Sequence, residues 1–280
     1  NSVILSFRDV KGYALVSISG IVLLVAVVLW SVNMGNLDQA LLSFVVGYAL
    51  MFFCSLVYFI LNRKEVTLKI GKPDGASLKK ISQFVLMAIS SIVLGKLLDF
   101  MVRDYVIELY GLDRTGLWQS VAKMSSSYLL VFSGTVGVVY YPKMASLIND
   151  EKALRSYVLK VMSFVAFITV ICLAIYYLNR EFVLNLFFAK GFEKAAYLVR
   201  FQAIGDFFCI LSYLLAYLLS ARVQTVKYII AQLFSALIYV VLVYLLMGRF
   251  NLEALTLAYL WRYIGFFLIL ILFNRKFLFT

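Results

Sequence analysis

The sequence has no histidine, only two prolines and few charged residues. Charged residues make up 14% of its 280 positions, whereas apolar residues make up 64%. Soluble domains are about 45–50% apolar and about 25% charged, so much of this apolar surface must face lipid. The absence of histidine removes the commonest metal ligand and general base, and it excludes every catalytic triad that contains histidine.

Cysteine is also scarce. Cys54, Cys172 and Cys209 all lie in apolar runs, and no Cys-x-x-Cys spacing occurs. This arrangement predicts neither a zinc site nor a disulfide framework. The net charge of +12 would indicate nucleic acid binding in a soluble protein, but in a membrane protein it indicates orientation. We therefore expect no metal ion and no nucleic acid partner.

Eight apolar runs are long enough to cross a bilayer as helices, which takes about 20 residues each. Strands of a membrane barrel would be about 10 residues long and would alternate in polarity, which these runs do not. The sequence therefore predicts an all-α polytopic helix bundle with about eight transmembrane helices. The predicted spans are residues 12–33, 39–62, 81–102, 116–141, 155–178, 195–220, 226–247 and 252–274.

Two connections stand out. The longest polar connection runs from Asn62 to Lys80 and contains the turn-rich string GKPDG, which makes it the best candidate for a boundary between two lobes. Residues 180–192 read REFVLNLFFAKGF, which is too short to span a membrane and too apolar for a loop. We expect an interfacial helix with Phe182, Leu186 and Phe187 toward lipid, ending near Gly191. The alternative is that this segment extends a neighbouring helix.

The distribution of lysine and arginine predicts the orientation. With eight spans, one side of the membrane collects sixteen of these residues and the other side seven. The basic side is cytoplasmic by the positive-inside rule. Both ends of this chain are therefore expected in the cytoplasm.

Five charged residues remain inside the predicted spans: Lys96, Asp99, Lys123, Asp206 and Arg262. Each costs about 2.5–3.5 kcal/mol at the centre of a membrane helix, so all should face the bundle interior or a wet cavity. Most of them lie on polar stripes at helical spacing. Arg103 and Arg200 lie at span edges, where an interface anchor and a ligand are equally good explanations.

Structural roles compete with this interpretation. Lys96 and Asp99 could form an ion pair within one helix, Lys123 could extend to the membrane surface, and Asp206 could serve packing. If the charges share a cavity, its positive bias favours an anionic cargo. Asp206, with Asp99 second, is then the candidate site for a coupling proton or sodium ion. We expect a secondary transporter without cofactors.

Several segments resemble one known family. GLWQSVAKMSSSYLLVFSGTVGVVYYPKMASL (residues 116–147) resembles the eighth spanning helix and following loop of O-antigen translocases, bacterial flippases of lipid-linked oligosaccharides. RDYVIELYGLDRTG (residues 103–116), RDVKGYAL (residues 8–15) and LVRFQAIGDFF (residues 198–208) resemble other parts of that family. The family belongs to the multidrug, oligosaccharidyl-lipid and polysaccharide exporter superfamily.

This resemblance implies a MATE-like fold of about twelve helices in two lobes. Residues 1–62 would be the last part of the N-terminal lobe, residues 63–80 a cytoplasmic linker, and residues 81–280 the six-helix C-terminal lobe. The chain begins with Asn1, and we expect further helices of the first lobe before it.

The resemblance also implies a cargo. An undecaprenyl-diphosphate-linked repeat unit of O-antigen or common antigen would move from the cytoplasmic to the periplasmic leaflet of the bacterial inner membrane by alternating access. Its phosphates or acidic sugars would be held by basic residues, and a glycan polymerase and a chain-length regulator would be candidate partners. Those basic residues would be Lys96, Lys123 and Arg262, with Arg103 and Arg200.

Three other functions remain as alternatives. An exporter of another anionic or drug-like solute could share the fold, although a cation exporter would need an acidic cavity. A membrane glycan polymerase or ligase would need acidic residues or histidine on a long external loop, whereas the external acids here are scattered over short loops. A scaffold would not explain charges at mid-membrane depth. We therefore do not expect an enzyme.

Overall fold

The computed structural model describes residues 10–33, 37–61 and 74–279, which form helices joined by short turns and contain no β-strand. The chain divides into two compact units between Lys72 and Pro73. This division falls within the predicted linker 63–80, of which residues 63–73 lie outside the described part. The assignment of the units to the two lobes of a larger transporter remains a prediction.

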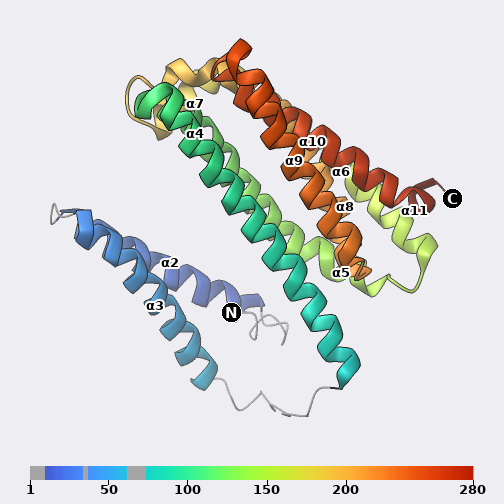
Figure 1. Ribbon diagram of the computed structural model, residues 1–280. Coiled ribbons are helices and arrows are strands. Elements are labelled where there is room, and N and C mark those ends of the chain that lie inside the picture. Colours follow the sequence, from blue (N-terminus) through green and yellow to red (C-terminus); the bar gives the residue numbers. More distant parts are fainter. Residues whose placement is uncertain (1–9, 34–36, 62–73, 280) are drawn as a thin grey trace. The chain divides into compact units, whose positions relative to one another are not determined.

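The first unit contains α2 (Val10–Asn33) and α3 (Leu37–Leu61), which pack along each other (Figure 1). Glycine permits close approach of these helices. A Cβ atom at Gly20 would lie 2.8 Å from Met51 Cγ, and one at Gly47 would lie 2.8 Å from Leu24 Cγ. Small residues commonly let membrane helices approach in this way. Most other apolar side chains of this pair are exposed, as expected where lipid surrounds the helices.

The second unit is a bundle of helices. In chain order its elements are α4 (Gly75–Thr135), the π-helix η2 (Val136–Tyr140), α5 (Tyr141–Ser146), α6 (Glu151–Leu178), α7 (Arg180–Phe187), the 3₁₀-helix η3 (Phe192–Leu198), α8 (Val199–Ala221), α9 (Thr225–Phe250), α10 (Glu253–Phe273) and α11 (Arg275–Phe279).

Helix α4 consists of two spans joined end to end. It has 61 residues, which as one straight helix would extend about 90 Å, three times the thickness of the hydrocarbon core. Gly111 interrupts it with φ 76° and ψ 175°, and the ribbon reverses direction (Figure 1). The span predicted at 81–102 therefore lies in the first arm of α4, and the span predicted at 116–141 comprises the second arm together with η2 and the first residue of α5.

Gly111 has a backbone conformation that essentially only glycine adopts. We expect Gly111→Ala to lower the free energy of unfolding by about 1–3 kcal/mol, measured by denaturant unfolding in detergent. The control is Gly134→Ala in the second arm of α4, where an added Cβ meets nothing within 4 Å and should be neutral or stabilising. Equal stability of the two variants would contradict the role of Gly111.

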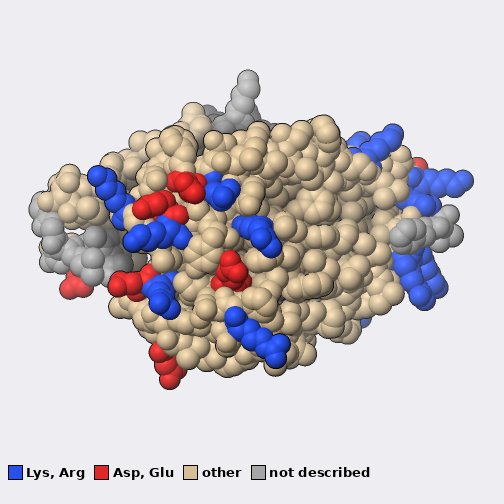
Figure 2. Space-filling model, turned by 90° about the horizontal axis from the view of Figure 1, so that it is seen from above, with Lys and Arg blue, Asp and Glu red and all other residues tan. Residues whose placement is uncertain are grey.

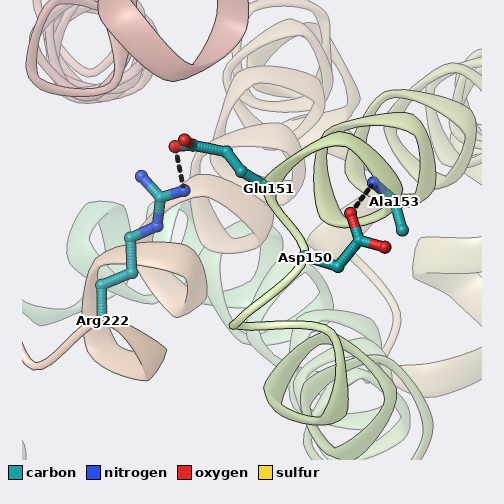
Figure 3. A network of polar contacts seen from close by, with 4 residues as sticks. All are labelled: Asp150, Glu151, Ala153 and Arg222. Carbon is teal, nitrogen blue, oxygen red and sulfur yellow. Dashed lines mark hydrogen bonds and ion pairs between the residues drawn. The ribbon is translucent and has the colours of Figure 1, made fainter.

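Carboxylates cap the N-termini of α4 and α6. Asp74 accepts a hydrogen bond from Ser77 N (3.0 Å), and hydrogen bonding by Ser77 lowers the pKa of the Asp74 carboxyl. Asp150 accepts from Ala153 N at 3.0 Å (Figure 3). Such caps satisfy backbone N–H groups that the first helical turn leaves free.

Arg222, at the end of α8, contacts residues of both α6 and α11. Its Nη2 lies 3.1 Å from Glu151 Oε1, so the end of α8 contacts the start of α6 (Figure 3). The same guanidinium lies 4.2 Å from the ring centroid of Phe277 in α11. Because Glu151 is largely exposed, this ion pair contributes at most about 1 kcal/mol.

Helix α8 is the central helix of the second unit, with fourteen buried residues. The first half of α8 packs in one apolar core together with α7, η3 and the start of α10. Its second half packs in another core with α6, the end of α10 and α11. In contrast, α6 buries only Leu154, Val158 and Thr169, so most of it presents apolar side chains outward.

Six described helical segments are long and apolar enough to cross a membrane, and a shorter apolar helix covers Leu42–Tyr58. One of the six, Ser77–Ser146, contains the two arms of α4. The eight predicted spans are thus accounted for, and the prediction of an all-α, multi-pass membrane protein is confirmed.

The predicted interfacial segment forms a helix of its own. Helix α7 follows α6 after a single residue, Asn179. Phe182, Leu186 and Phe187 are exposed and Leu184 is buried, as the pattern predicts. The predicted end near Gly191 is four residues too late, because α7 ends at Phe187 and Gly191, with φ 105°, lies in the turn that follows. The alternative, that the segment merely extends a neighbouring helix, is wrong.

Candidate functional site

A cavity of about 620 Å³ lies within the second unit, between α4, α8, α9 and α10. Its charged lining residues are Lys96, Asp99 and Arg262, which gives a formal charge of +1. The rest of its polar lining carries mainly hydroxyl groups. Five tyrosines line it: Tyr213, Tyr217, Tyr228, Tyr259 and Tyr263. The cavity is large enough for a drug-sized or oligosaccharide headgroup.

Arg262 is fixed at the wall of this cavity by neighbours on two helices. Its Nε donates a hydrogen bond to Ser235 Oγ of α9 at 3.0 Å. Its guanidinium carbon lies 5.3 Å from the ring centroid of Tyr239 and 5.0 Å from that of Tyr263. Among the described residues, no acceptor hydrogen-bonds its terminal amino groups. These groups can therefore bind two oxygens of one phosphate or carboxylate.

A smaller cavity of about 90 Å³ adjoins the large one. The two share a boundary of lining residues that includes Asp99, Ser126, Tyr259 and Arg262. Beyond this boundary, Trp118, Ser125 and Gln202 line the small cavity. The polar space thus continues past Arg262 toward the start of α8, where Gln202 lies.

Asp206 is completely buried beside the small cavity. Its Oδ1 accepts hydrogen bonds from Ser125 Oγ (2.6 Å) and Tyr259 Oη (2.7 Å), and its Oδ2 accepts one from the Tyr128 hydroxyl. Gln202 Nε2 donates to Ser125 Oγ at 3.1 Å, which orients that hydroxyl. A buried carboxylate needs such donors, because an unpaired charge in an apolar interior is very costly. The described residues include no salt-bridge partner for Asp206.

The structure brings together four of the seven predicted site residues. Lys96, Asp99 and Arg262 line the large cavity, and Asp206 lies behind Tyr259. The alternative of a Lys96–Asp99 ion pair is wrong, because the ion pairs of the described residues do not include it. Asp206 is hydrogen-bonded in the bundle interior. This placement agrees both with an ion-coupling role and with the alternative that Asp206 serves packing.

The other three predicted residues lie outside both cavities. Lys123, Arg103 and Arg200 are exposed, and Arg200 lies 4.5 Å from the ring centroid of its neighbour Phe201. Charges of both signs are exposed around the α4 bend, including Asp104, Glu108 and Arg114. In Figure 2 blue and red side chains are likewise interspersed on the end that faces the viewer. A role of these three residues in cargo binding remains a prediction.

Sequence reasoning missed the residues that hold the charges in place. Ser125 and Tyr128 are three positions apart on α4, so helical spacing could have placed them together beside the polar stripe. Ser235 and Tyr239 on α9 contact Arg262 across a helix boundary, and no local pattern indicates that contact. No group of three or more cysteine or acidic residues in the described part of the chain could hold a metal ion.

Cysteine labelling can test whether the large cavity is wet. After replacement of Cys54, Cys172 and Cys209, we expect Gln232→Cys in the cavity to react with a membrane-impermeant maleimide. Leu237→Cys on the same helix should not react, because Leu237 is exposed on the apolar surface, where lipid excludes the reagent. Equal reaction at the two positions, or none at 232, would contradict a water-filled cavity.

The fold is MATE-like, as two solved structures show. The chain is similar to "Crystal structure of MATE in the bent conformation" (TM-score 0.79, 14% identity, 96% of this chain and 62% of that one). It is also similar to "Outward-facing conformation of a multidrug resistance MATE family transporter of the MOP superfamily" (TM-score 0.71, 14% identity, 92% of this chain and 61% of that one). At this identity the likeness shows the fold alone.

The family is shown by sequence. Residues 5–197 match the family described as "Polysaccharide biosynthesis protein", and the chain belongs to that family. Over 263 residues the chain is 26% identical to proteins named "Lipid III flippase" from Escherichia coli (strain K12) and Shigella flexneri. Those matches cover 93% of this chain and 63% of each relative. The chain therefore spans less than two thirds of the length of these curated relatives.

Proposed function

We propose that this protein is a flippase that moves an undecaprenyl-diphosphate-linked oligosaccharide, an O-antigen or common-antigen repeat unit, from the cytoplasmic to the periplasmic leaflet. The observation that carries this proposal is the cavity inside the second unit, whose wall presents the Arg262 guanidinium among tyrosine hydroxyls. The family match and the relatives named as flippases support it. The protein would act by alternating access and would be a transporter, not an enzyme.

The physical need for such a cavity is clear. A diphosphate and its sugars carry many polar groups, each of which would cost several kcal/mol if it entered hydrocarbon unpaired. Arg262 would bind the diphosphate as a fork, and Lys96 would add a second positive charge. Serine and tyrosine hydroxyls would pair with the sugars, and the lipid chain would stay in the bilayer.

The remaining parts of the proposal concern coupling, location and partners. Asp206, with Asp99 second, would bind a coupling proton or sodium ion. The excess of lysine and arginine on one side supports a cytoplasmic C-terminus. The proposed location is the bacterial inner membrane. A glycan polymerase and a chain-length regulator are the expected functional partners. A second candidate function, export of another anionic or drug-like solute, is favoured by the MATE-like fold.

A flipping assay separates these two candidates. The protein expressed from its native gene would be reconstituted in vesicles that carry a fluorescent undecaprenyl-diphosphate-linked sugar. We expect the fluorophore of the inner leaflet to become accessible to an impermeant reductant at a rate that depends on the protein. No flipping of this lipid, together with efflux of a soluble drug-like anion, would support the exporter instead.

A further inference from the structure

Tyr259 lies between the buried carboxylate of Asp206 and the large cavity. Its hydroxyl donates to Asp206 Oδ1 at 2.7 Å, while its ring lines both the large and the small cavity. The other tyrosine bonded to Asp206, Tyr128, lines neither cavity. Tyr259 therefore contacts the Asp206 carboxylate and also lines the two cavities.

The ring of Tyr259 is also linked to Arg262 through a second aromatic ring. It packs edge-to-face against the ring of Tyr263, with centroids 4.7 Å apart. The Tyr263 ring in turn lies 5.0 Å from the guanidinium carbon of Arg262. Side chains on one face of α10 thus form a continuous series of contacts from the carboxylate to the cationic wall.

Gly205 makes room for this arrangement. A Cβ atom at position 205 would lie 2.6 Å from Tyr259 Cδ1 and 2.9 Å from its Cε1. An added Cβ would overlap the ring, so the ring can keep this position only if residue 205 is glycine. The adjacent Gly205 and Asp206 therefore have complementary roles, since the first accommodates the ring and the second binds the hydroxyl.

We propose that Tyr259 is the positioning residue through which the state of the Asp206 carboxylate changes the cargo cavity, and that Gly205 is required to seat its ring. When the carboxylate is protonated or binds a cation, its oxygens accept hydrogen bonds more weakly. The bond from the Tyr259 hydroxyl then weakens, and the ring turns toward the cavity that Tyr259 lines. The cavity then holds its cargo less tightly. This inference rests on the proposed function only in assigning a lipid diphosphate to the cavity.

A double-mutant cycle tests this coupling without knowledge of the ion. Asp206→Asn imitates the neutral carboxylate, and undecaprenyl diphosphate in nanodiscs serves as the probe. We expect Asp206→Asn to weaken binding of the probe about fivefold or more, within the usual range of coupling between sites. In the Tyr259→Phe background the same change should alter the affinity less than about twofold, since the link is already absent.

Two further variants separate this mechanism from simpler ones. In the Tyr128→Phe background, which removes another donor to Asp206 but leaves the cavity lining intact, the effect of Asp206→Asn should persist. Gly205→Ala should weaken binding as Asp206→Asn does, while Gly134→Ala, whose added Cβ meets nothing within 4 Å, should not. Tighter binding in Asp206→Asn that persists in Tyr259→Phe would indicate a direct effect of charge and would overturn the proposal.

A second measurement does not depend on the cargo. Ser126 lies on the boundary of the two cavities, so a cysteine at that position reports access past Tyr259. We expect Asp206→Asn to slow its reaction with a water-soluble maleimide about fivefold, and to have no effect when Tyr259 is phenylalanine. If the wild type binds no undecaprenyl diphosphate, the proposed function fails and this rate alone decides the inference. An unchanged rate overturns it.

Discussion

Replacing Arg262 with alanine should weaken binding of undecaprenyl diphosphate about 10- to 100-fold and should abolish flipping. The guanidinium is anchored through Nε on Ser235, so its terminal amino groups are pre-positioned for phosphate oxygens. Hydrogen bonds to charged groups contribute about 1.5–3 kcal/mol each, which corresponds to this loss of affinity. The measurements are probe binding in nanodiscs and complementation of surface glycan in a deletion strain.

The controls for this prediction use the same chemical change elsewhere. Arg249→Ala removes an exposed arginine from the last turn of α9 and should leave binding unchanged. Arg262→Lys keeps the charge but loses the planar fork, so its affinity should be intermediate. Membrane levels of each variant report whether insertion is intact. Normal surface glycan with Arg262→Ala would remove Arg262 from the site.

Replacing Asp206 with asparagine should make flipping independent of an imposed proton or sodium gradient. The buried carboxylate is held by three hydroxyl donors from α4 and α10, and the described residues give it no basic partner. A cation or proton is therefore the natural counter-charge for this group. Asparagine keeps the size of the side chain but can neither ionise nor carry the acidic proton. The measurement is the flipping rate in vesicles with and without each gradient.

Asp104→Asn is the matched control, because Asp104 is an exposed carboxylate of α4 near its bend. Its flipping rate should respond to the gradient as the wild type does. If Asp206→Asn retains the full gradient response, the coupling ion binds elsewhere, and Asp99 at the cavity wall becomes the next candidate.

The four charged residues at the cavities differ in how firmly neighbouring side chains hold them. Asp206 and Arg262 each have hydrogen-bond or ring partners on neighbouring helices, so their positions are defined by packing. Lys96 and Asp99 are exposed and line the cavity. The cavity wall thus combines a guanidinium whose position is set by packing with two charged groups that the described residues leave without an ion-pair partner.

The sequence by itself determined the membrane spans, the helical class and the short separate helix α7. A helix in lipid satisfies its own backbone hydrogen bonds, so the length and polarity of each run are local properties that the sequence contains directly. The depth of Arg262 and Asp206 in their spans follows from the same count along the helix. The Gly-Asp pair at positions 205 and 206 was also visible in the sequence. The sequence did not show that both residues contact Tyr259.

Only the tertiary structure decided which way each polar side chain points. Lys123 and Ser126 are three residues apart on one arm of α4, yet Ser126 lines both cavities and Lys123 lies outside them. The contacts of Arg262 with Ser235 and of Asp206 with Ser125 join helices that are distant in sequence. The rotation of a helix about its axis depends on how neighbouring helices pack, and no periodicity within a single span contains that information.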